Sequence, residues 1–434
     1  MKIKTQKNTI IGALTFSVLL FNCSPNDEDG IPRIGNIPDP AFEQALIELG
    51  YDDVLDGEIL TANVVEVNEL NISGYNLNLV DKMRDLKGIE YFTSLSKLNC
   101  SAQNISSLDL SNNLNLKELE IADMVSENLA NLNISKNIEL KILKCFRSGI
   151  TNLDLSKAVN LIELYTYENL QLSNLNIDNN VDLKKLWCYG NNLSQLDISN
   201  NIDLEFLDCR FNKLSVLDVD TNTNLKHLSF WDNSILRINL SNNLALELLD
   251  CTDNLLTNID VSKHIALETF GCSGNKLNNI DITKNRALKS FACDNNQISS
   301  LDVSKNIALR TLSFGNNPIS SIDISSNLAL ENLTCLNTRI TSLDVTNNLA
   351  LEILWCNNNQ QLTSLDVSNN ASITWLQCYN NQLTGLNLSN NLNLTNLNCT
   401  SNNITCIQVN DSQLANIPTN WIKDDVTNYA TICN

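Results

Sequence analysis

The sequence has few of the residues on which most catalytic and metal sites depend. It contains two histidines, His227 and His264, among 434 residues. It also lacks a nucleophile motif, a Gly-rich phosphate loop and the ligand spacing of a metal site. These absences predict a protein that is not an enzyme and that uses neither a cofactor nor a metal ion.

Positive charge is scarce as well. The chain has 29 lysines and arginines against 49 acidic residues, which gives a formal net charge of −20. A chain this acidic repels nucleic acid phosphates and anionic lipid headgroups. We therefore expect no nucleic acid partner, and contact of the folded part with a membrane only through an anchor.

No apolar run in the sequence is long enough to cross a bilayer as a helix. The apolar run near the N-terminus, Ile10–Phe21, is too short for a span. It follows a basic start with Lys2, Lys4 and Lys7, which is the pattern of a signal peptide over residues 1–22.

The end of this segment resembles a bacterial lipoprotein leader. Leu20 lies three residues before Cys23, and the acidic run SPNDEDG after Cys23 is similar to the surface-export tag of some Gram-negative lipoproteins. Asn22 departs from the small residue usual before the cysteine. The resemblance implies that Cys23 is lipidated, that residues 23–36 form a tether and that the protein sits at the outer membrane or cell surface. A free or removed Cys23 is the alternative.

The rest of the chain repeats one pattern with a period of about 21 residues, clearest at Leu288–Asn306, LKSFACDNNQISSLDVSKN. Each repeat has two half-lines of the form apolar-x-x-apolar-x-apolar-x-x-Asn. A period of this length is typical of a solenoid, which grows by stacking units. We expect the solenoid over residues 93–410, an N-terminal cap over 37–92 and a C-terminal cap over 411–434.

Fifteen first half-lines can be counted, and eleven of them have cysteine at the centre. Phenylalanine, isoleucine or threonine replaces it elsewhere, as expected of a packing position and not of a metal or disulfide position. The sequence predicts a ladder of buried, reduced thiols. The centres are Cys100, Ile121, Cys145, Thr166, Cys188, Cys209, Phe230, Cys251, Cys272, Cys293, Phe314, Cys335, Cys356, Cys378 and Cys399.

The second half-line also occurs fifteen times. Both half-lines alternate apolar and polar residues, which predicts two short parallel strands per coil. Because the two sides would then be similar in thickness, we expect a flattened, gently curved or twisted body with two parallel sheets. The asparagine that ends each half-line predicts two buried amide ladders, in which His264 replaces one asparagine.

The pattern L-x-x-L-x-C-x-x-N-x-L-x-x-L-D-V-S-x-N, as in Leu267–Asn285, resembles the leucine-rich repeat superfamily. It is most similar to the short bacterial type sometimes called IRREKO, with an internalin-like cap arrangement. The resemblance implies an all-β-dominated leucine-rich repeat solenoid of about 15 coils with an N-terminal helical cap. It implies little about function, because such repeats have many partners.

Both ends carry features of caps. Asp39 and Pro40 begin an amphipathic helix that Gly50 ends. The acidic group Asp52, Asp53, Asp56 and Glu58 lacks the spacing of a calcium loop and is interpreted as a solvated loop. At the other end, Cys406 and Cys433 lie outside the cysteine column. They predict a disulfide that holds the tail over the last coil.

Two surfaces could contact other molecules. The second half-lines present an acidic column that either binds cations weakly or keeps the surface soluble. Its members are Asp109, Asp154, Asp197, Asp218, Asp260, Asp281, Asp302, Asp323, Asp344 and Asp366. The first half-lines present varied aromatic residues, the candidate ligand-binding residues Trp187, Tyr189, Phe206, Arg210, Trp231, Trp355, Trp375 and Tyr379.

Exposed aromatic residues beside charges favour recognition of a protein or polysaccharide. Packing between coils that only stiffens the sheet is the alternative for these residues. We therefore expect a cell-surface, lipid-anchored, monomeric protein that binds a protein or glycan through the aromatic sheet. A structural envelope spacer without a specific ligand is the other function left open.

Overall fold

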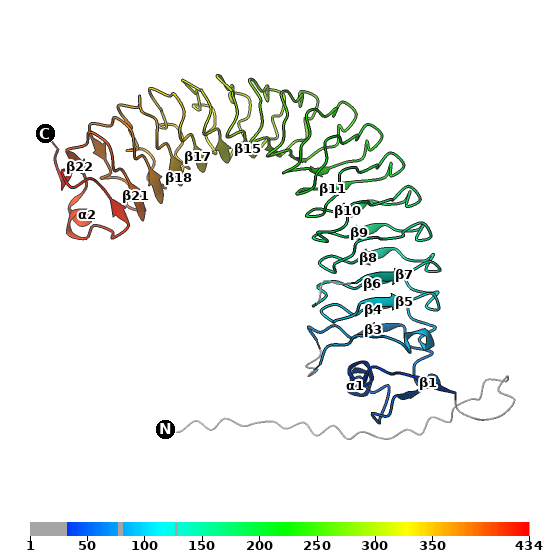
Figure 1. Cartoon of the computed structure of the whole chain (residues 1–434). Helices are drawn as coiled ribbons and strands as arrows, with labels where there is room; N and C mark the ends of the chain where they lie inside the picture. The colour runs from blue at the N-terminus through cyan, green and yellow to red at the C-terminus, as the bar shows by residue number, and fades with distance from the viewer. Residues whose placement is uncertain (1–32, 77–80, 126–128, 434) are drawn as a thin grey trace, which may run out of the picture.

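The computed structural model describes residues 33–76, 81–125 and 129–433 of the chain (Figure 1). The predicted signal peptide and Cys23 lie outside the described residues. Within the described part, no helix is both long and apolar enough to cross a membrane.

An N-terminal cap of one helix and one pair of antiparallel strands precedes the coils. Strand β1 (Ile34–Asn36) pairs antiparallel with β2 (Glu58–Leu60), and α1 spans Pro40–Glu48. The predicted Asp39 cap is confirmed, since its Oδ1 accepts hydrogen bonds from Ala41 N at 2.9 Å and Phe42 N at 3.1 Å. Its Oδ2 accepts from the backbone of Arg84 and Asp85. One carboxylate therefore caps the helix and ties it to the loop that leads into the coils.

The acidic loop after α1 is held by a carboxylate of the helix. The backbone N–H groups of Asp56 and Gly57 donate to Oε1 of Glu43, which is buried. Two short 3-10 turns, η1 (Thr61–Asn63) and η2 (Ile89–Tyr91), then lead to the first full coil. Burial of Phe42, Leu46 and Phe92 under this cap covers the open end of the core.

One parallel sheet runs through all the coils. In the described residues it has seventeen strands in the order β3-β4-β6-β8-β9-β10 and onward to β19-β21-β23. Neighbouring strands pair in register, as Leu186 does with Leu207. The fifteen predicted first half-lines correspond to β4 to β21, and the cap strands β3 and β23 flank them.

The strands are three residues long except at the C-terminal end. Their bounds are β3 (Glu69–Asn71), β4 (Lys97–Asn99), β6 (Glu118–Glu120), β8 (Ile142–Lys144), β9 (Glu163–Tyr165), β10 (Lys185–Trp187), β11 (Phe206–Asp208), β12 (His227–Ser229), β13 (Leu248–Asp250), β14 (Thr269–Gly271), β15 (Ser290–Ala292), β16 (Thr311–Ser313), β17 (Asn332–Thr334), β18 (Ile353–Trp355), β19 (Trp375–Gln377), β21 (Asn396–Asn398) and β23 (Trp421–Ile422).

The core is a column of side chains from the middle of each strand and from the cysteine position. Eleven cysteines of this column are free and buried, as predicted. Phe230 and Phe314 take the same position and are fully buried. Burial raises the pKa of the thiols, to about 12 for Cys145 and Cys356. The thiols are therefore protonated packing groups at neutral pH.

The prediction of a second strand in every coil is wrong. Second half-lines form strands only near the two ends of the described solenoid, in β5 (Ser107–Asp109) with β7 (Asn131–Asn133) and in β20 (Leu386–Asn387) with β22 (Cys406–Gln408) and β24 (Asn428–Ala430). Elsewhere the described residues have a single bridge, between Asp344 and Asp366.

The reason is the curvature of the solenoid, and the expected flattened, gently curved body is also wrong. Figure 1 shows an arch whose inner side carries the long sheet, whereas the second half-lines lie on the outer side. Strands of a sheet lie about 4.8 Å apart. When the inner side keeps this spacing, bending moves the outer half-lines apart, and their backbone groups no longer reach each other.

Asparagine side chains connect the coils on the outer side instead. Nδ2 of Asn306 donates to the carbonyl oxygens of Ile282 at 2.9 Å and Asn285 at 2.8 Å, both in the preceding coil. His264 occupies this ladder as predicted, with Nε2 3.1 Å from the carbonyl oxygen of Leu240. The buried ladder members are Asn113, Asn137, Asn180, Asn201, Asn222, Asn243, His264, Asn285, Asn306, Asn327, Asn348, Asn370 and Asn391.

The C-terminal cap closes the other end. Its helix α2 spans Asp411–Ala415, and a disulfide joins Cys406 to Cys433 with Cα atoms 5.8 Å apart. Trp421 is 7% exposed, and its Nε1 donates to the carbonyl oxygen of Leu394. Ile422, which we expected to share in covering the last coil, is 54% exposed. Trp421 therefore provides the apolar cover at this strand.

Candidate functional site

The inner sheet of the arch presents three residues per coil to solvent. In β10, Leu186 is buried, whereas Lys185 and Trp187 point to the opposite face. Cys188 turns back into the core, and Tyr189 then points outward beside Trp187. This alternation follows from the period of two in a strand. The same three positions recur every coil, so they form three columns along the arch.

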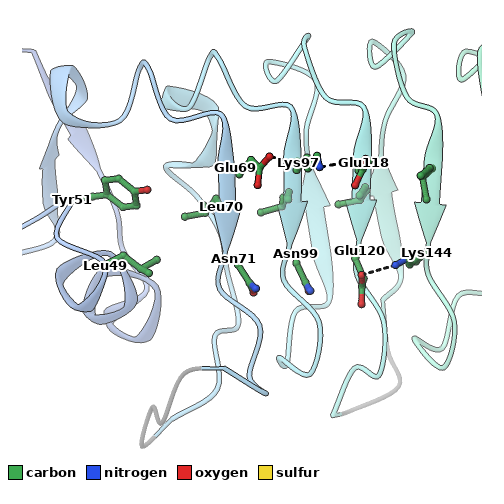
Figure 2. A pocket seen from close by; sticks show the side chains of 13 residues that line it. Leu49, Tyr51, Glu69, Leu70, Asn71, Lys97, Asn99, Glu118, Glu120 and Lys144 are labelled. Atoms are coloured by element: carbon green, nitrogen blue, oxygen red, sulfur yellow. Dashed lines mark hydrogen bonds and ion pairs between the residues drawn. The ribbon is translucent and has the colours of Figure 1, made fainter.

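At the N-terminal end these columns carry charges that pair with each other. A hollow of about 450 Å³ lies between the cap and β8. Figure 2 shows the side chains that line it. Lys97 Nζ lies 3.6 Å from carboxylate oxygens of both Glu69 and Glu118. Lys144 Nζ lies 3.1 Å from Glu120. The opposite charges offset one another, and this end of the face offers no single-sign field for a charged ligand.

Aromatic side chains dominate the next coils, from β8 to β12. Tyr165 and Trp187 stack with ring centroids 4.1 Å apart and planes 8° apart. Trp187 contacts Phe206 at 4.3 Å, and Phe206 stacks on His227 at 4.1 Å. Tyr165 with Trp187, and Phe206 with His227, are equivalent positions of neighbouring strands, which the sheet places at nearly the spacing that stacked rings prefer. Trp187 and Phe206 lie in different columns, so the stack crosses from one column to another at this contact.

A second stack runs beside the first, at the position after the cysteine. Phe146 and Tyr167, and then Tyr167 and Tyr189, stack with centroids 4.4 Å apart in each pair. An arginine lies over each end, with the guanidinium carbon of Arg147 5.4 Å from the Phe146 centroid and that of Arg210 5.0 Å from Tyr189. We call the two stacks together the aromatic belt. Its rings are Phe146, Tyr165, Tyr167, Trp187, Tyr189, Phe206 and His227.

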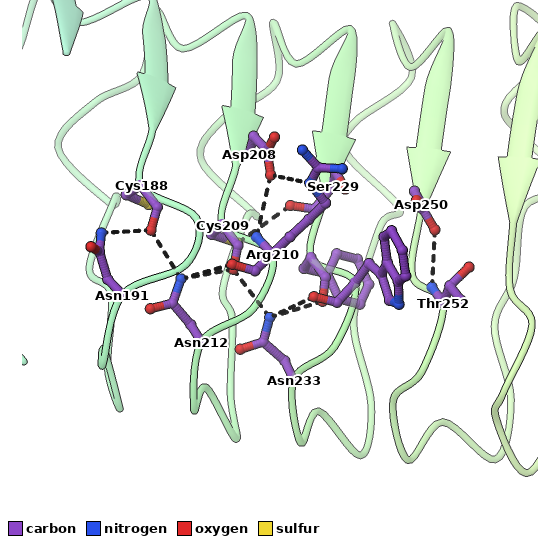
Figure 3. Close-up of polar contacts among 12 residues, drawn as sticks. Cys188, Asn191, Asp208, Cys209, Arg210, Asn212, Ser229, Asn233, Asp250 and Thr252 are labelled. Atoms are coloured by element: carbon purple, nitrogen blue, oxygen red, sulfur yellow. Dashed lines mark hydrogen bonds and ion pairs between the residues drawn. The ribbon is translucent and has the colours of Figure 1, made fainter. Parts of the chain in front are cut away.

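Asparagine side chains fix the turns that carry the second stack (Figure 3). Nδ2 of Asn212 donates to the carbonyl oxygens of Cys188 at 2.9 Å, Cys209 at 3.1 Å and Arg210 at 3.1 Å. Asn191 makes the equivalent bond to Cys188. Tyr189 and Arg210 thus project from a backbone held from two coils at once, so this surface is preformed.

An ion pair between Arg210 and a buried carboxylate anchors the C-terminal edge of the belt. Nε of Arg210 donates to Oδ1 of Asp208 at 2.9 Å, and Asp208 is only 4% exposed. Burial raises the pKa of Asp208, although Arg210 opposes this effect. Because the carboxylate holds the guanidinium over Tyr189, Arg210 presents a fixed cation at the edge of the belt.

The belt tyrosines carry protonated hydroxyls at neutral pH. Burial raises the pKa of Tyr167 to about 12 and also raises that of Tyr189. The pKa of Tyr165 is raised by burial and by its hydrogen bond to Glu163 at 2.7 Å. Since the rings cover one another's faces, the belt offers ring edges and hydroxyl groups to a partner.

Trp231 extends the aromatic surface past Arg210. Its Nε1 donates to Oδ2 of Asp253 at 2.9 Å, and its ring lies 5.0 Å from that of Phe211. Phe211 is 42% exposed and has a φ of 51°. A left-handed backbone is uncommon for a bulky residue. The fold therefore holds an apolar side chain in solvent beside the belt.

The predicted residues of the C-terminal coils form a separate cluster. Trp355 and Trp375 meet edge to face with centroids 5.3 Å apart, and Trp375 is 38% exposed. Tyr379 lies on the same coil as Trp375 and is half-buried. The eight candidate residues are thus divided among three places. Trp187, Tyr189 and Phe206 lie in the belt, Arg210 lies at its edge and Trp231 lies beside it. Trp355, Trp375 and Tyr379 form the separate C-terminal cluster.

Small residues separate the two aromatic clusters. Gly271, Ala292 and Ser313 follow one another in the column that holds Trp187. Oδ1 of Asp294 accepts hydrogen bonds from Ser313 Oγ and from Gly315 N, both at 2.7 Å. A side chain at Gly315 would lie about 3.0 Å from this carboxylate. The middle of the inner face therefore carries small side chains, with one aromatic cluster on each side of it along the arch.

Our sequence analysis missed four belt residues, Phe146, Tyr165, Tyr167 and His227. Each lies one coil, about 21 residues, from a predicted residue or another belt residue in a column of outward positions. Aligning those columns would have found them. Burial and the nearby Arg210 lower the pKa of His227, so it joins the belt as a neutral ring.

The acidic column on the outer side has a local structural role. Oδ1 of Asp302 accepts a hydrogen bond from the backbone of Ser304 at 2.9 Å, and Asp260 and Asp366 do the same with Ser262 and Ser368. Hydrogen bonds from the side chain and the backbone of each serine lower the pKa of each carboxyl. Within the described residues, no group of three or more histidine, cysteine or acidic side chains could hold a metal ion. Each aspartate fixes its own turn.

No protein-family model and no curated protein matches this sequence. Several solved structures do match. The functional domain of InlJ from Listeria monocytogenes, described as including a cysteine ladder, is 26% identical with a TM-score of 0.63, and the match covers 85% of this chain and 82% of that one.

Two further structures are similar at lower identity. A leucine-rich repeat protein from Leptospira interrogans is 20% identical, with a TM-score of 0.64, over 85% of this chain and 97% of that one. A structure of PEPR1 with AtPEP1 is 18% identical, with a TM-score of 0.53, over 84% of this chain and 69% of that one. The chain therefore has the leucine-rich repeat fold, built from repeats of about 21 residues.

Proposed function

We propose that this protein is a binding protein, not an enzyme, and that it recognises a partner protein through the aromatic belt. The observation that carries the proposal is the continuous double stack on the inner face. Its seven rings lie outside the buried core column. Rigid aromatic side chains contribute large contact areas at a low cost in conformational entropy.

The geometry favours a protein over a polysaccharide at the belt. A sugar ring packs its C–H groups against the negative face of an aromatic ring. The belt rings pair face to face, which leaves edges, hydroxyls and the Arg210 cation for contact. Of the similar structures, PEPR1 is described with AtPEP1.

A polysaccharide is the second candidate, at the separate C-terminal cluster. Trp355 and Trp375 do not stack face to face, and Trp375 is exposed. The two candidates use different residues, so one set of variants tests both.

The experiment probes arrays of extracellular proteins and of polysaccharides with the purified protein. The double variant Trp187→Ala/Tyr189→Ala should weaken binding to a protein partner by at least about tenfold, as expected for aromatic hot spots. Trp355→Ala/Trp375→Ala tests the C-terminal cluster. The control is Val216→Ala on the outer side, where Val216 is 70% exposed. Unchanged binding by both double variants would contradict the proposal and favour a spacer role.

We further propose that Cys23 carries a lipid that anchors the protein at the outer membrane or cell surface. The support is the sequence pattern around Cys23 and the length of the tether before the described cap. Mass spectrometry of the mature N-terminus should find an acylated Cys23 as the first residue. An unmodified N-terminus upstream of Cys23 would exclude the anchor.

A further inference from the structure

An exposed aliphatic ridge follows one flank of the arch. It consists of the residue directly after each position of the outer asparagine ladder, and eleven coils place Leu, Ile or Val there. Their exposed fractions are 53% for Leu114, 52% for Ile138, 40% for Val159, 49% for Val181, 56% for Ile202, 51% for Leu244, 71% for Ile265, 64% for Ile307, 62% for Leu328, 60% for Leu349 and 66% for Leu392.

The ridge lies on neither face discussed so far. Each member occupies the turn that leads from the outer half-line into the next inner strand, as Ile307 does before β16. Figure 1 shows that these turns recur coil after coil along the arch. The ridge is thus a line of apolar side chains along the side of the molecule, separate from the aromatic belt.

The fold itself does not require aliphatic residues there. Thr223 and Arg286 occupy the same position in two coils and are also exposed. The ladder residues before them keep their bonds, from Asn222 to the carbonyl of Ile198 at 3.0 Å and from Asn285 to that of Val261 at 2.8 Å. Since a polar or charged residue leaves the turn intact, the eleven aliphatic side chains need another explanation.

The apolar area is large for a surface with no partner. A fully exposed aliphatic side chain offers roughly 100 Å² of apolar surface, so eleven half-exposed ones leave on the order of 600 Å². The largest patch on a typical monomer is about 300–600 Å². Alanines widen the ridge from β13 to β18, namely Ala245, Ala266, Ala287, Ala308, Ala329 and Ala350. With them, the area approaches the roughly 800 Å² per partner of a standard interface.

The charges beside the ridge indicate what covers it. Acidic and basic side chains of neighbouring coils form ion pairs there, with Lys226 Nζ 2.8 Å from Glu205 and Lys289 Nζ 2.7 Å from Glu268. A mixed row does not repel its own copy, whereas a helix or ridge that binds an anionic membrane has an excess of Lys and Arg.

We propose that the ridge is the interface of a homodimer, in place of the monomer that the sequence led us to expect. Two copies then meet flank to flank about a two-fold axis. A two-fold axis places the same patch of both chains in contact, with the two solenoids running in opposite directions. Both aromatic belts stay accessible in this arrangement, because the belt lies on the inner face. The inference goes beyond the proposed recognition function and does not depend on it.

The test measures the mass of the purified mature protein by light scattering and sedimentation, up to about 100 µM protein. We expect a dimer. The double variant Ile265→Glu/Ile307→Glu buries two unpaired charges in the interface and should raise the dimer Kd at least about 100-fold. Val216→Glu, an equally exposed site away from the ridge, is the matched control and should remain dimeric. Circular dichroism checks that each variant folds.

A gain-of-affinity variant gives an independent readout. Arg286→Leu fills a gap in the ridge and should lower the dimer Kd several-fold. A monomeric parent at the highest concentration, or a dimer unaffected by the glutamates, would overturn the proposal. Binding of the parent to phosphatidylcholine vesicles that Ile265→Glu/Ile307→Glu abolishes would also overturn it, because the ridge would then contact lipid.

Discussion

The two sides of each coil have nearly the same sequence pattern but different structures. On the inner side, three-residue strands pair into one sheet of seventeen described strands. On the outer side, the same alternation of apolar and polar residues gives strands only near the ends of the described solenoid. The comparison shows that a strand pattern produces a strand only where the neighbouring coil is close enough to pair.

The two asparagine ladders differ in the same way. On the inner side, Oδ1 of Asn296 accepts a hydrogen bond from Leu277 N at 3.0 Å, and its Nδ2 donates to three carbonyl oxygens. On the outer side, Nδ2 of Asn306 donates to two carbonyls, and its buried Oδ1 has no partner among the described residues. Each side chain thus makes two bonds to the preceding coil, but only the inner one also bonds its own turn and pairs its amide oxygen.

The largest expected effect concerns the thiol column of the inner side and alkaline pH. Folding raises the pKa of these thiols above the value of about 8.5 in an unfolded chain, so their contribution to stability is complete below pH 8.5 and is lost above it. Above pH 8.5, each thiol lowers the free energy of unfolding by about 1.4 kcal/mol per pH unit. Eleven thiols together lower it by more than about 10 kcal/mol per pH unit. Denaturant midpoints under reducing conditions should fall steeply between pH 8 and pH 11.

The control for this prediction replaces three column members, Cys272, Cys293 and Cys335, with valine. The variant should lose less stability over the same pH range, because fewer thiols ionise on unfolding. An equal loss would show that lysine and tyrosine titration, not the column, causes the effect.

A smaller effect compares the two ladders directly. Asn306→Ala removes one of the two donors to each of two carbonyl oxygens, those of Ile282 and Asn285, which keep their backbone donors. We expect it to lower the free energy of unfolding by about 1–3 kcal/mol. Asn296→Ala also removes the acceptor for Leu277 N and should cost at least about 1 kcal/mol more. Urea unfolding of the two variants measures both values. Equal costs, or the reverse order, would contradict the difference between the ladders.

A stabilising substitution follows from the histidine in the outer ladder. His264 contacts the carbonyl of Leu240, and its buried Nδ1 has no partner in the described chain. An asparagine there can donate to the carbonyls of both Leu240 and Asn243, as its neighbours in the ladder do. His264→Asn should raise the free energy of unfolding by about 0.5–1.5 kcal/mol. Destabilisation in the same urea titration would mean that the imidazole fills space an amide cannot.

The smallest effect concerns acid and the outer aspartates. Their pKa values are lowered in the folded protein, so the stability they add is present above about pH 4 and is lost as pH falls below it. Asn239 accepts the same turn bond, from Ser241 N, without a charge. Asp302→Asn should therefore reduce the loss in free energy of unfolding below about pH 4 without changing the turn. Because solvent screens the exposed carboxylate, the reduction should be only about a few tenths of a kcal/mol. Identical acid unfolding curves for the two proteins would contradict this role.

The fold was largely predictable because one pattern repeats. Phenylalanine replaces cysteine in some coils at the centre of the first half-line, and this replacement alone indicates a packing position. The Asp39 cap and the Cys406–Cys433 pair also follow from local residue chemistry. The candidate site was only partly predictable. Trp187 and Tyr189 stood out as exposed aromatics, but the rings they stack on, Tyr165 and Tyr167, did not.

The sequence by itself determined which side chains are buried, where each coil turns and which residues can share a column, since these depend on the local alternation of apolar and polar residues and on turn chemistry. Only the tertiary structure decided the curvature, the loss of the outer strands and the division of the aromatic residues into a belt and a separate cluster. Small rotations between successive coils add up along the arch. The summed rotation sets the curvature of the arch and the spacing of the coils on its outer side, and the sequence of a single repeat does not specify this sum.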